Sequence, residues 1–552
     1  MRNDLKTLGR ILSHCKYHTL IYVIVTIIVA SRNFLITYLI AFLSKTVIRA
    51  VQGGSMTSMQ VTIINYLILL AVFILADTAS QYLQSNTIHK IGNRLRAQAM
   101  NSIMRAEMAK LDAIGGRVEV ITRMNSDIDL ICDILGSKVL MPLMYLISGI
   151  GAAISIFDID ILFGFIMIAA GVLISALDSL MAKPVRLARR DYQESRAALA
   201  RSFEEDHRLS MNIKLMNMAE RASMDFEGKL DDYQKKNDNL GRVCVIRGFI
   251  SQFDGIIRTV GVVLIGILLN KMGRIGVDEI AYGAELAPLI ITMLSSIGGA
   301  YVALQNSMTG VDRVHELMAL EGEDDSGKRD AYNDSPAFIE CRNAGLRYAN
   351  GNWGFRNLNM TVPDHQIVGL HGASGSGKSS LLRSIMRLYR YTDGRICLFG
   401  HDVKDYSLPF LRKSIAYVQQ ENLLFEGTYL ENLRLGNEAN APEEKIMAVL
   451  ELIGSTQWIE ARGGLNANVT EGGRDISGGQ RQQIAIARAL MSDRRIIIFD
   501  EAFAGVDAGH IEKIMTHLDS IKAKRAILII SHDEKVLDRC DRLLSYESSA
   551  PA

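Results

Sequence analysis

A glycine-rich stretch near the C-terminus has the residue types and spacing of a phosphate-binding loop. It matches G-x-x-x-x-G-K-[ST], a pattern in which backbone N–H groups surround phosphate oxygens. The apolar run 366–371 predicts a buried strand before this loop, and we expect a helix from Lys378 onward. Helix N-termini attract anions, so this context favours phosphate over a plain glycine-rich turn. The residues of this phosphate loop are Gly372, Ala373, Ser374, Gly375, Ser376, Gly377, Lys378 and Ser379.

Other stretches supply groups that hydrolysis of a phosphoanhydride requires. Lys378 is expected at the β- and γ-phosphates and Ser379 on Mg²⁺. The apolar segment 495–499 predicts a strand ending at Asp500, which can reach the metal through water. Glu501 follows directly, and a carboxylate there can polarise the attacking water as a general base.

The signature run, Ile476-Ser477-Gly478-Gly479-Gln480, narrows the interpretation. A serine and paired glycines at the start of a helix can bind a γ-phosphate through backbone amides. A kinase-like phosphate-loop protein, the main alternative, would not carry this run. In this order, downstream of about half a chain of apolar helices, these motifs resemble those of the ATP-binding cassette transporters. The resemblance covers essentially the whole chain.

The resemblance implies a role for each matched residue, with ATP and Mg²⁺ as cofactors. His532, after the apolar strand 527–531, matches the family's switch histidine, and it would be catalytic together with Glu501 and Gln420. Gln420, rather than its neighbour Gln419, aligns with the glutamine that meets Mg²⁺ and water. The metal would be held by Ser379, Gln420 and Asp500. ATP would be bound by the phosphate loop together with Tyr348 (which would stack on adenine, with Trp353 as the alternative), Ser380, Ser477, Gly478, Gly479, Gln480 and Asp507.

One chain cannot complete such a site alone, because Lys378 already occupies one side of the phosphate that Ser477 would bind. In the family, two cassettes pair head to tail, and each signature run completes the partner's site. The sequence has one cassette and no internal repeat. We therefore expect a dimer, most simply a two-fold homodimer. A heterodimer with a degenerate partner stays open.

Length and composition predict a membrane protein with more than one domain. Its 552 residues are too many for a single core of about 250–300 residues. Hydrophobic residues make up 49%, and the net charge of +1 gives no sign of a nucleic-acid partner. The six cysteines are scattered, which predicts neither a zinc site nor a disulfide framework.

Six apolar stretches approach the length of about 20 residues that a bilayer crossing needs. Lys and Arg are concentrated in the long segments 84–136 and 182–244, which places these segments and both termini in the cytoplasm. Each long segment contains a break, near 111–116 and 211–218, where a short transverse element can lie; in the family such elements couple to the cassettes, and ordinary hairpin turns are the alternative. The predicted spans are 18–46, 61–83, 137–157, 161–181, 245–270 and 280–304.

The predicted fold is an all-α transmembrane domain of the ABC exporter type followed by an α/β P-loop cassette. We assign residues 1–320 to the membrane domain, 321–336 to an acidic linker and 337–552 to the cassette. We expect no peptidase domain ahead of the first span. The expected location is the cytoplasmic (inner) membrane of a bacterium, among lipid, with the cassette in the cytoplasm.

Polar residues inside the spans indicate the kind of cargo. Ionisable groups in a membrane usually face a cavity or pair with each other. We expect Arg32, Asn33 and Glu285 to line a substrate cavity, whereas Asp254 and Arg258 lie four apart and can neutralise each other. The expected function is ATP-driven export of a polar or amphipathic substrate, such as a peptide or peptide-like metabolite. A lipid or lipid-linked sugar flippase, and a siderophore importer of exporter architecture, remain the alternatives.

Overall fold

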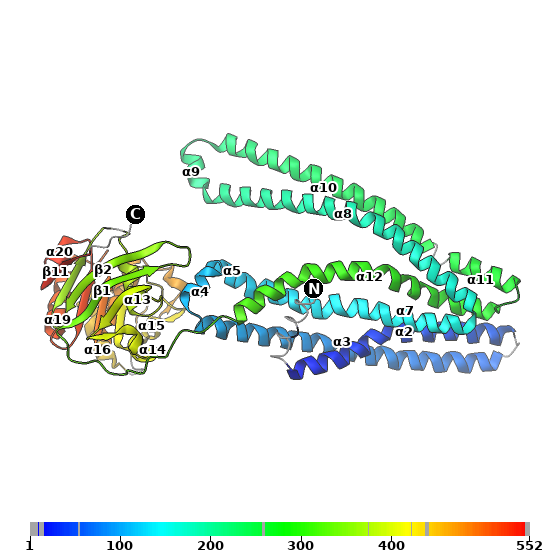
Figure 1. The fold of residues 1–552 in the computed structure, drawn as a ribbon, viewed down its shortest axis with the longest axis horizontal. Helices are drawn as coiled ribbons and strands as arrows, with labels where there is room; N and C mark the ends of the chain where they lie inside the picture. The colour runs from blue at the N-terminus through cyan, green and yellow to red at the C-terminus, as the bar shows by residue number, and fades with distance from the viewer. Residues whose placement is uncertain are drawn as a thin grey trace. The chain divides into compact units, whose positions relative to one another are not determined.

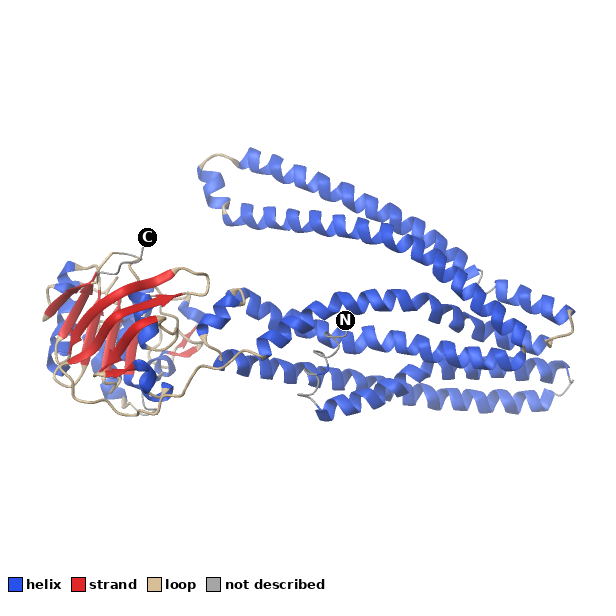
Figure 2. Cartoon of the chain, viewed as in Figure 1, coloured by secondary structure: helices blue, strands red, loops and turns tan. Residues whose placement is uncertain are grey.

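The chain folds into two compact units, one helical and one built around β-sheets (Figures 1 and 2). The computed structural model describes residue 9 and residues 16–52, 56–256, 260–373, 375–420, 422–435 and 441–546. The helical unit comprises residues 1–101 and 121–319, and the second unit comprises residues 102–120 and 320–552. The predicted succession of an all-α domain and an α/β domain is confirmed.

Long helices form the first unit. Four helical stretches of the described chain are long and apolar enough to cross a membrane: 18–52, 63–105, 118–159 and 161–208. The helices are α2 (Lys16–Gln52), α3 (Met56–Arg105), α6 (Ile128–Asp133), α7 (Val139–Ile159), α8 (Ile161–Arg208), α9 (Ser210–Leu215), α10 (Ala219–Ile256), α11 (Val262–Lys271) and α12 (Val277–Met318), with π-helical turns η1 (Arg123–Asp127) and η2 (Ile134–Lys138). Helix α5 (Gly116–Thr122) spans the boundary between the two units.

The fifth predicted span is divided between two helices, whereas the sixth lies within one long helix. The fifth, 245–270, falls on the end of α10 and on the short apolar helix α11, and residues 257–259 lie outside the described part. The sixth, 280–304, lies within α12. The count of six spans therefore stays a prediction.

Helix α12 packs against α2, α7 and α8, and glycines permit the close approach. A Cβ added at Gly149 of α7 would lie 2.4 Å from the Cβ of Met293, and one at Gly171 of α8 would lie 2.7 Å from a methyl of Leu294. Membrane helices commonly pack through small residues, since apolar side chains gain little by leaving lipid. These glycines let α12 contact two neighbouring helices.

Two crossed ion pairs join the C-terminal end of α12 to the π-helical turn η1. Arg123 Nη1 lies 2.6 Å from Glu316 Oε2, and Arg313 Nη2 lies 2.7 Å from Asp127 Oδ1. Asp127 and Arg123 are both buried. A π-turn adds a residue to the helix and commonly marks a functional position. Here it holds both buried charges against one face of α12.

Helices α8 and α10 run side by side and are joined by α9 (Figure 1). The short helix α9 falls where the sequence predicts the second transverse element. At this end Met211, Leu215 and Met216 are 72%, 73% and 69% exposed. Three adjacent large apolar side chains at such exposure make a surface suited to a protein partner.

Two main sheets form the second unit. A five-stranded parallel sheet has the order β11 (Arg542–Ser545), β3 (Ile367–His371), β10 (Ala526–Ile530), β9 (Ile496–Asp500), β6 (Ile415–Val418). An antiparallel sheet has the order β2 (Trp353–Pro363), β1 (Ala337–Arg347), β4 (Asp393–Leu398), β5 (His401–Asp402). The small pair β7 (Gly427–Thr428) and β8 (Asn468–Val469) is separate. Strands β3, β9 and β10 are almost wholly buried, which explains their continuous apolar sequence.

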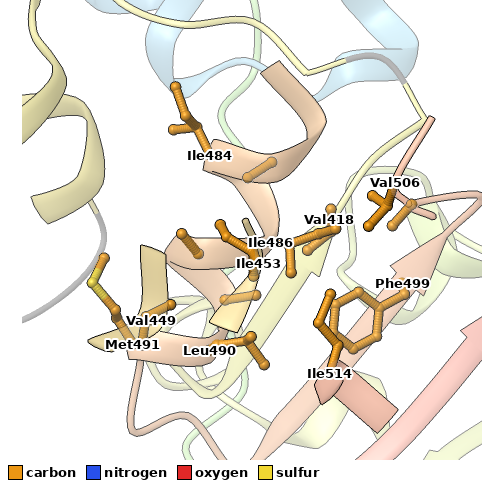
Figure 3. Close-up of a cluster of buried hydrophobic side chains, with 14 of the residues drawn as sticks. Val418, Val449, Ile453, Ile484, Ile486, Leu490, Met491, Phe499, Val506 and Ile514 are labelled. Atoms are coloured by element: carbon orange, nitrogen blue, oxygen red, sulfur yellow. The ribbon is translucent and has the colours of Figure 1, made fainter. Parts of the chain in front are cut away.

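Helices cover the parallel sheet and build the larger core. In Figure 3, Ile486 and Leu490 of α18 lie with Phe499 of β9 and Ile514 of α19 in one buried cluster. The helices of this unit are α4 (Met108–Ala113), α13 (Lys378–Ile385), α14 (Leu408–Ser414), α15 (Tyr429–Arg434), α16 (Glu443–Leu452), α17 (Thr456–Ala461), α18 (Gly478–Met491), α19 (Ala508–Ile521) and α20 (Glu534–Leu537).

The short helix α4 belongs to the sheet-containing unit although it lies early in the chain. Ala109 packs against the core beneath the antiparallel sheet. Tyr389 donates a hydrogen bond from its hydroxyl to Asp112, and Arg390 Nε lies 2.9 Å from Glu107 Oε1. The first predicted transverse element is therefore held by both packing and polar contacts.

We predict that Asp127→Ala destabilises the helical unit. The substitution leaves Arg313 without its partner, and breaking a buried ion pair costs about 3 kcal/mol, the low end of the usual range because Arg313 is partly exposed. Thermal unfolding in detergent measures the change. The exposed neighbour Asp312→Ala is the control, with an expected change within about 0.5 kcal/mol. Equal effects of the two substitutions contradict the role of the ion pair.

Candidate active site

Four of the predicted site segments lie at one edge of the parallel sheet. The phosphate loop follows β3, Asp500 ends β9, His532 follows β10, and Gln420 follows β6. In a parallel sheet the carboxyl ends of adjacent strands share an edge, which is where α/β sheets bind ligands. Strands β3, β10, β9 and β6 are neighbours in that order. The sheet topology thus brings together segments that are more than 100 residues apart.

The phosphate loop turns sharply into helix α13. Gly377 has φ +101°, and a Cβ at this position would lie 2.0 Å from the Gly354 carbonyl oxygen, so only glycine fits. Lys378 begins the helix, is 7% exposed, and donates from Nζ to the carbonyls of Gly372 (2.7 Å) and Ala373 (2.8 Å). Burial lowers the pKa of Lys378, and the nearby Glu501 and Asp500 oppose this shift. The lysine is pre-positioned beside the loop's N–H groups.

Asp500 has the environment of a ligand to a hard cation. Its Oδ2 accepts hydrogen bonds from Tyr417 OH at 2.8 Å and from Ser379 Oγ at 3.3 Å. No cluster of three or more His, Cys, Asp or Glu suited to a metal occurs in the described part of the chain. A hydroxyl and a carboxylate beside a phosphate loop fit Mg²⁺, which usually takes one or two protein ligands and completes its shell with water and phosphate oxygens.

Glu501 is contacted by two other residues that the sequence predicts to be catalytic. Gln420 Nε2 donates to Glu501 Oε2 at 2.7 Å, and His532 Nε2 lies 3.5 Å from Oε1. The backbone of Glu501 is left-handed, with φ +51°, while its N–H donates to Ile530 O at 2.9 Å. Non-glycine residues in this conformation concentrate at functional sites. The carboxylate, amide and imidazole predicted to be catalytic therefore lie in contact.

The signature run starts helix α18. Ser477 Oγ accepts from the Gln480 N–H at 3.2 Å, and Gln480 Oε1 accepts from the Ser477 N–H at 3.0 Å, which is a capping box. Gly479 lies against Gly505, since a Cβ on Gly479 would be 3.1 Å from the Gly505 carbonyl oxygen. Asp507 caps the next helix, α19, by accepting from the Gly509 N–H at 3.1 Å. These two predicted ATP-binding segments thus lie side by side.

Tyr348 lies beside the start of α13. Its hydroxyl is 2.8 Å from Ser380 Oγ, and its ring makes an edge contact with Tyr389 at 5.3 Å between centroids. Trp353 instead lies between the guanidinium groups of Arg347 and Arg356. The position of Tyr348 is compatible with adenine stacking, which stays a prediction. Ser374 lies outside the described residues.

Three residues of the site were not identified from the sequence: Tyr417, Asn422 and Gln482. Tyr417 contacts Asp500, while Gln482 accepts from Asn422 Nδ2 at 3.3 Å. Tyr417 and Asn422 flank the predicted Gln420, so closeness in sequence was the available signal for them. Gln482 is one of three glutamines in a helix start, and nothing in the spacing singles it out.

The fold and the site define a class before any comparison is made. The chain joins bilayer-length helices to an α/β domain in which a phosphate loop, Asp500 and the adjacent Glu501 lie at one edge of a parallel sheet. Comparison with protein-family models agrees with this class. Residues 19–294 match the ABC transporter transmembrane region, and residues 355–504 match the ABC transporter ATP-binding domain.

Curated relatives give the same result. A putative export ATP-binding/permease protein of Rickettsia felis is 24% identical over 568 aligned positions, covering 100% of this chain and 96% of the relative. An ATP-dependent lipid A-core flippase of Pectobacterium atrosepticum is 32% identical over 49% of this chain and 47% of its own length. An alpha-hemolysin translocation ATP-binding protein of Escherichia coli O157:H7 is 32% identical over 50% of this chain and 39% of its own. The chain thus spans half or less of the latter two relatives.

The chain belongs to the ABC transporter family. It has the arrangement of an exporter-type half-transporter, with one membrane domain followed by one ATP-binding domain. Its ATPase domain is of the kind that couples ATP hydrolysis to transport.

We predict that Tyr417→Phe weakens binding of Mg²⁺. The substitution removes the 2.8 Å hydrogen bond that fixes one oxygen of Asp500, and loss of such an outer partner typically lowers metal affinity about 10- to 100-fold. The Mg²⁺ dependence of binding of a fluorescent ATP analogue measures this without turnover. Tyr391→Phe is the matched control, because Tyr391 donates to Asp402, a carboxylate on β5 of the antiparallel sheet. A similar change in both variants, or in neither, contradicts the assignment.

Proposed function

We propose that two copies of this chain form an exporter in a bacterial cytoplasmic membrane, driven by hydrolysis of Mg²⁺-bound ATP, for a polar or amphipathic cargo such as a peptide. The observation that carries the proposal is the contact of Gln420 and His532 with Glu501, beside the phosphate loop and on the same chain as bilayer-length helices. Its bacterial relatives include proteins named for alpha-hemolysin translocation and for flipping of the lipid A-core.

The residues of the site divide the chemistry between them. Bound ATP supplies the phosphoanhydride bond to be broken. Lys378 exchanges its loop carbonyls for phosphate oxygens, and its positive charge offsets the charge that develops there. Glu501 accepts a proton from water, with Gln420 fixing one carboxylate oxygen at 2.7 Å. Ser379 would provide an oxygen ligand for Mg²⁺, and Asp500, 3.3 Å from the Ser379 hydroxyl, would reach the metal through water.

Two features support a dimer with shared ATP sites. The capping box uses the N–H of Gln480, so the N–H groups of Gly478 and Gly479 have no partner within their own helix. These donors, at the positive end of α18, suit a phosphate carried by another chain. The exposed apolar end formed by Met211, Leu215 and Met216 likewise suits a surface on a second copy.

We predict that mixed dimers reveal the shared site. Glu501→Gln removes the base, and Ser477→Glu places a negative charge where phosphate would bind; each homodimer should lose at least about 100-fold in ATPase activity. A dimer of one Glu501→Gln subunit with one Ser477→Glu subunit retains one intact site, so it should recover up to about half of the wild-type rate.

The reverse arrangement gives the opposite result. When both substitutions lie in one subunit paired with wild type, each shared site contains one defect, and activity should stay lost. ATPase rates of differentially tagged, doubly purified dimers provide the measurement. If each chain instead holds its own complete site, the dimer with one substitution in each subunit should be inactive. The dimer with both substitutions in one subunit should then keep about half of the wild-type rate.

Paired polar groups within the helices support a polar or amphipathic cargo. Arg32 Nη1 of α2 lies 3.0 Å from Asp77 Oδ2 of α3, and Asn33 Nδ2 lies 3.4 Å from Ser148 Oγ. Arg32 is therefore paired rather than alone, yet its side chain keeps 28% exposure. Glu285 of α12 is exposed. Charged groups in bilayer-length helices are costly and usually serve a pathway. The pair Asp254 and Arg258 falls outside the described residues and side chains.

A lipid flippase is the second candidate. The 32% identity with a lipid A-core flippase favours it, although the match covers about half of each chain. An acidic headgroup and an acidic peptide both offer an anion that can compete with Asp77 for Arg32. The two functions therefore share one anion-binding group and differ in the cargo's apolar part.

We predict that Arg32→Ala abolishes stimulation of ATPase by acidic cargo. The substitution removes the cation and leaves Asp77 unpaired, so a double variant with Asp77→Ala separates lost recognition from an unpaired charge. Reconstituted protein is tested against peptides and labelled phospholipids, for both ATPase stimulation and transport, with Glu501→Gln as the transport-dead reference. Transport of peptides alone supports export, transport of lipids alone supports the flippase, and full stimulation in the double variant contradicts a role for Arg32.

A further inference from the structure

One buried amide connects the signature helix to the hydrolytic side of the same cassette. Gln482 lies in α18, five positions after Ser477, and is 6% exposed. Its Nε2 lies 3.3 Å from the carbonyl oxygen of Gln419 and 3.4 Å from that of Glu501. Its Oε1 accepts from Asn422 Nδ2 at 3.3 Å. Both polar atoms of the Gln482 side chain therefore contact either the segment around Gln420 (residues 419–422) or Glu501.

The two carbonyls belong to Gln419 and Glu501, whose backbone positions determine where the side chains of Gln420 and Glu501 lie. Gln419 directly precedes Gln420, whose amide holds the Glu501 carboxylate at 2.7 Å. Asn422 fixes the same loop from its other side by donating to the Gln419 carbonyl at 2.6 Å. Glu501 itself sits in a left-handed backbone conformation. A shift of Gln482 would therefore move both the base and the amide that orients it.

Helix α18 is suited to carry such a shift. It is 14 residues long, and Ile484, Ile486 and Leu490 anchor it in the buried cluster of Figure 3. Gln482 lies about 7.5 Å along the helix axis from Ser477, at a rise of 1.5 Å per residue. Ser477 and Gln482 are thus separated by about one and a half turns of one hydrogen-bonded helix, so we expect a displacement at Ser477 to be passed on to Gln482.

We propose that Gln482 is a positioning residue that couples the signature run to Glu501 of the same chain. The proposal rests on the shared ATP sites of the proposed dimer. Phosphate bound at one site by the signature run of a subunit shifts that subunit's α18. Gln482 then adjusts Gln420 and Glu501, which serve the other site. Hydrolysis at the two sites is therefore cooperative.

The adjacent residue provides a matched control. Gln483 is the same residue type on the same helix, and its amide is also satisfied, by Trp458 Nε1 at 2.9 Å and the Ile453 carbonyl at 3.0 Å. Those partners lie in α17 and at the end of α16, away from the phosphate loop, Gln420 and Glu501. Methionine has similar length and no amide, so Gln482→Met and Gln483→Met remove equivalent groups and keep the packing volume.

The experiment measures ATPase rate against ATP concentration in the purified full-length dimer, together with equilibrium binding of a fluorescent ATP analogue. For Gln482→Met we expect kcat to fall roughly tenfold or more, because small misplacement of a catalytic group is costly. The Hill coefficient should fall from above one toward one, while analogue affinity stays within about twofold. Gln483→Met should keep the wild-type kcat and Hill coefficient, even where it lowers thermal stability.

Three outcomes overturn the inference: wild-type kcat and Hill coefficient in Gln482→Met, the same losses in Gln483→Met, or a wild-type Hill coefficient of one. The mixed dimers described above separate this failure from failure of the proposed dimer. If those dimers show a shared site while Gln482→Met behaves as wild type, the site stands and the coupling does not. If they show a complete site in each chain, the coupling loses its basis as well.

Discussion

The catalytic arrangement depends on how the Glu501 carboxylate is held. Glu501 follows a wholly buried strand, so its position is fixed by the core, and its left-handed backbone turns the chain immediately afterwards. One carboxylate oxygen accepts from Gln420 and the other lies near His532. Because each partner follows a neighbouring strand of one parallel sheet, the sheet order sets all three positions together. The three side chains therefore depend on the order of the strands and on the short loops that follow them.

The side chain of Lys378 in the phosphate loop is likewise held in place by neighbouring groups. A buried ammonium without partners is unfavourable, and Lys378 avoids this by donating to the loop's own carbonyls. These bonds hold its side chain close to the N–H groups that would face phosphate. Binding then exchanges neutral acceptors for charged ones, which form stronger hydrogen bonds. Little side-chain entropy remains to be lost, because the lysine is already ordered.

Residues that are close in the sequence could be grouped into one site from their spacing, whereas contacts between residues far apart in the sequence could not be predicted. The phosphate loop, the signature run and the Asp500–Glu501 pair each occupy a few consecutive positions, so their spacing was readable. The contact of Tyr417 with Asp500 joins residues 83 apart. The role of Arg32 in a cavity stays a prediction, and its pairing with Asp77 of the next helix depends on how α2 and α3 lie together. No local pattern encodes such pairings.

In the helical unit, contacts between residues far apart in the sequence fix the position of the end of α12. The sequence around Arg123 and Asp127 resembles a loop of the family, but it does not show their partners; the π-turn η1 sets both residues against α12. A buried ion pair adds little net stability compared with well-packed apolar residues, but it strongly penalises any arrangement that separates its partners. The crossed pairs therefore favour a small number of discrete positions for the end of α12. Discrete alternatives of this kind are what a transporter needs, because an element that deforms continuously cannot convert hydrolysis at a distant site into a defined change of access.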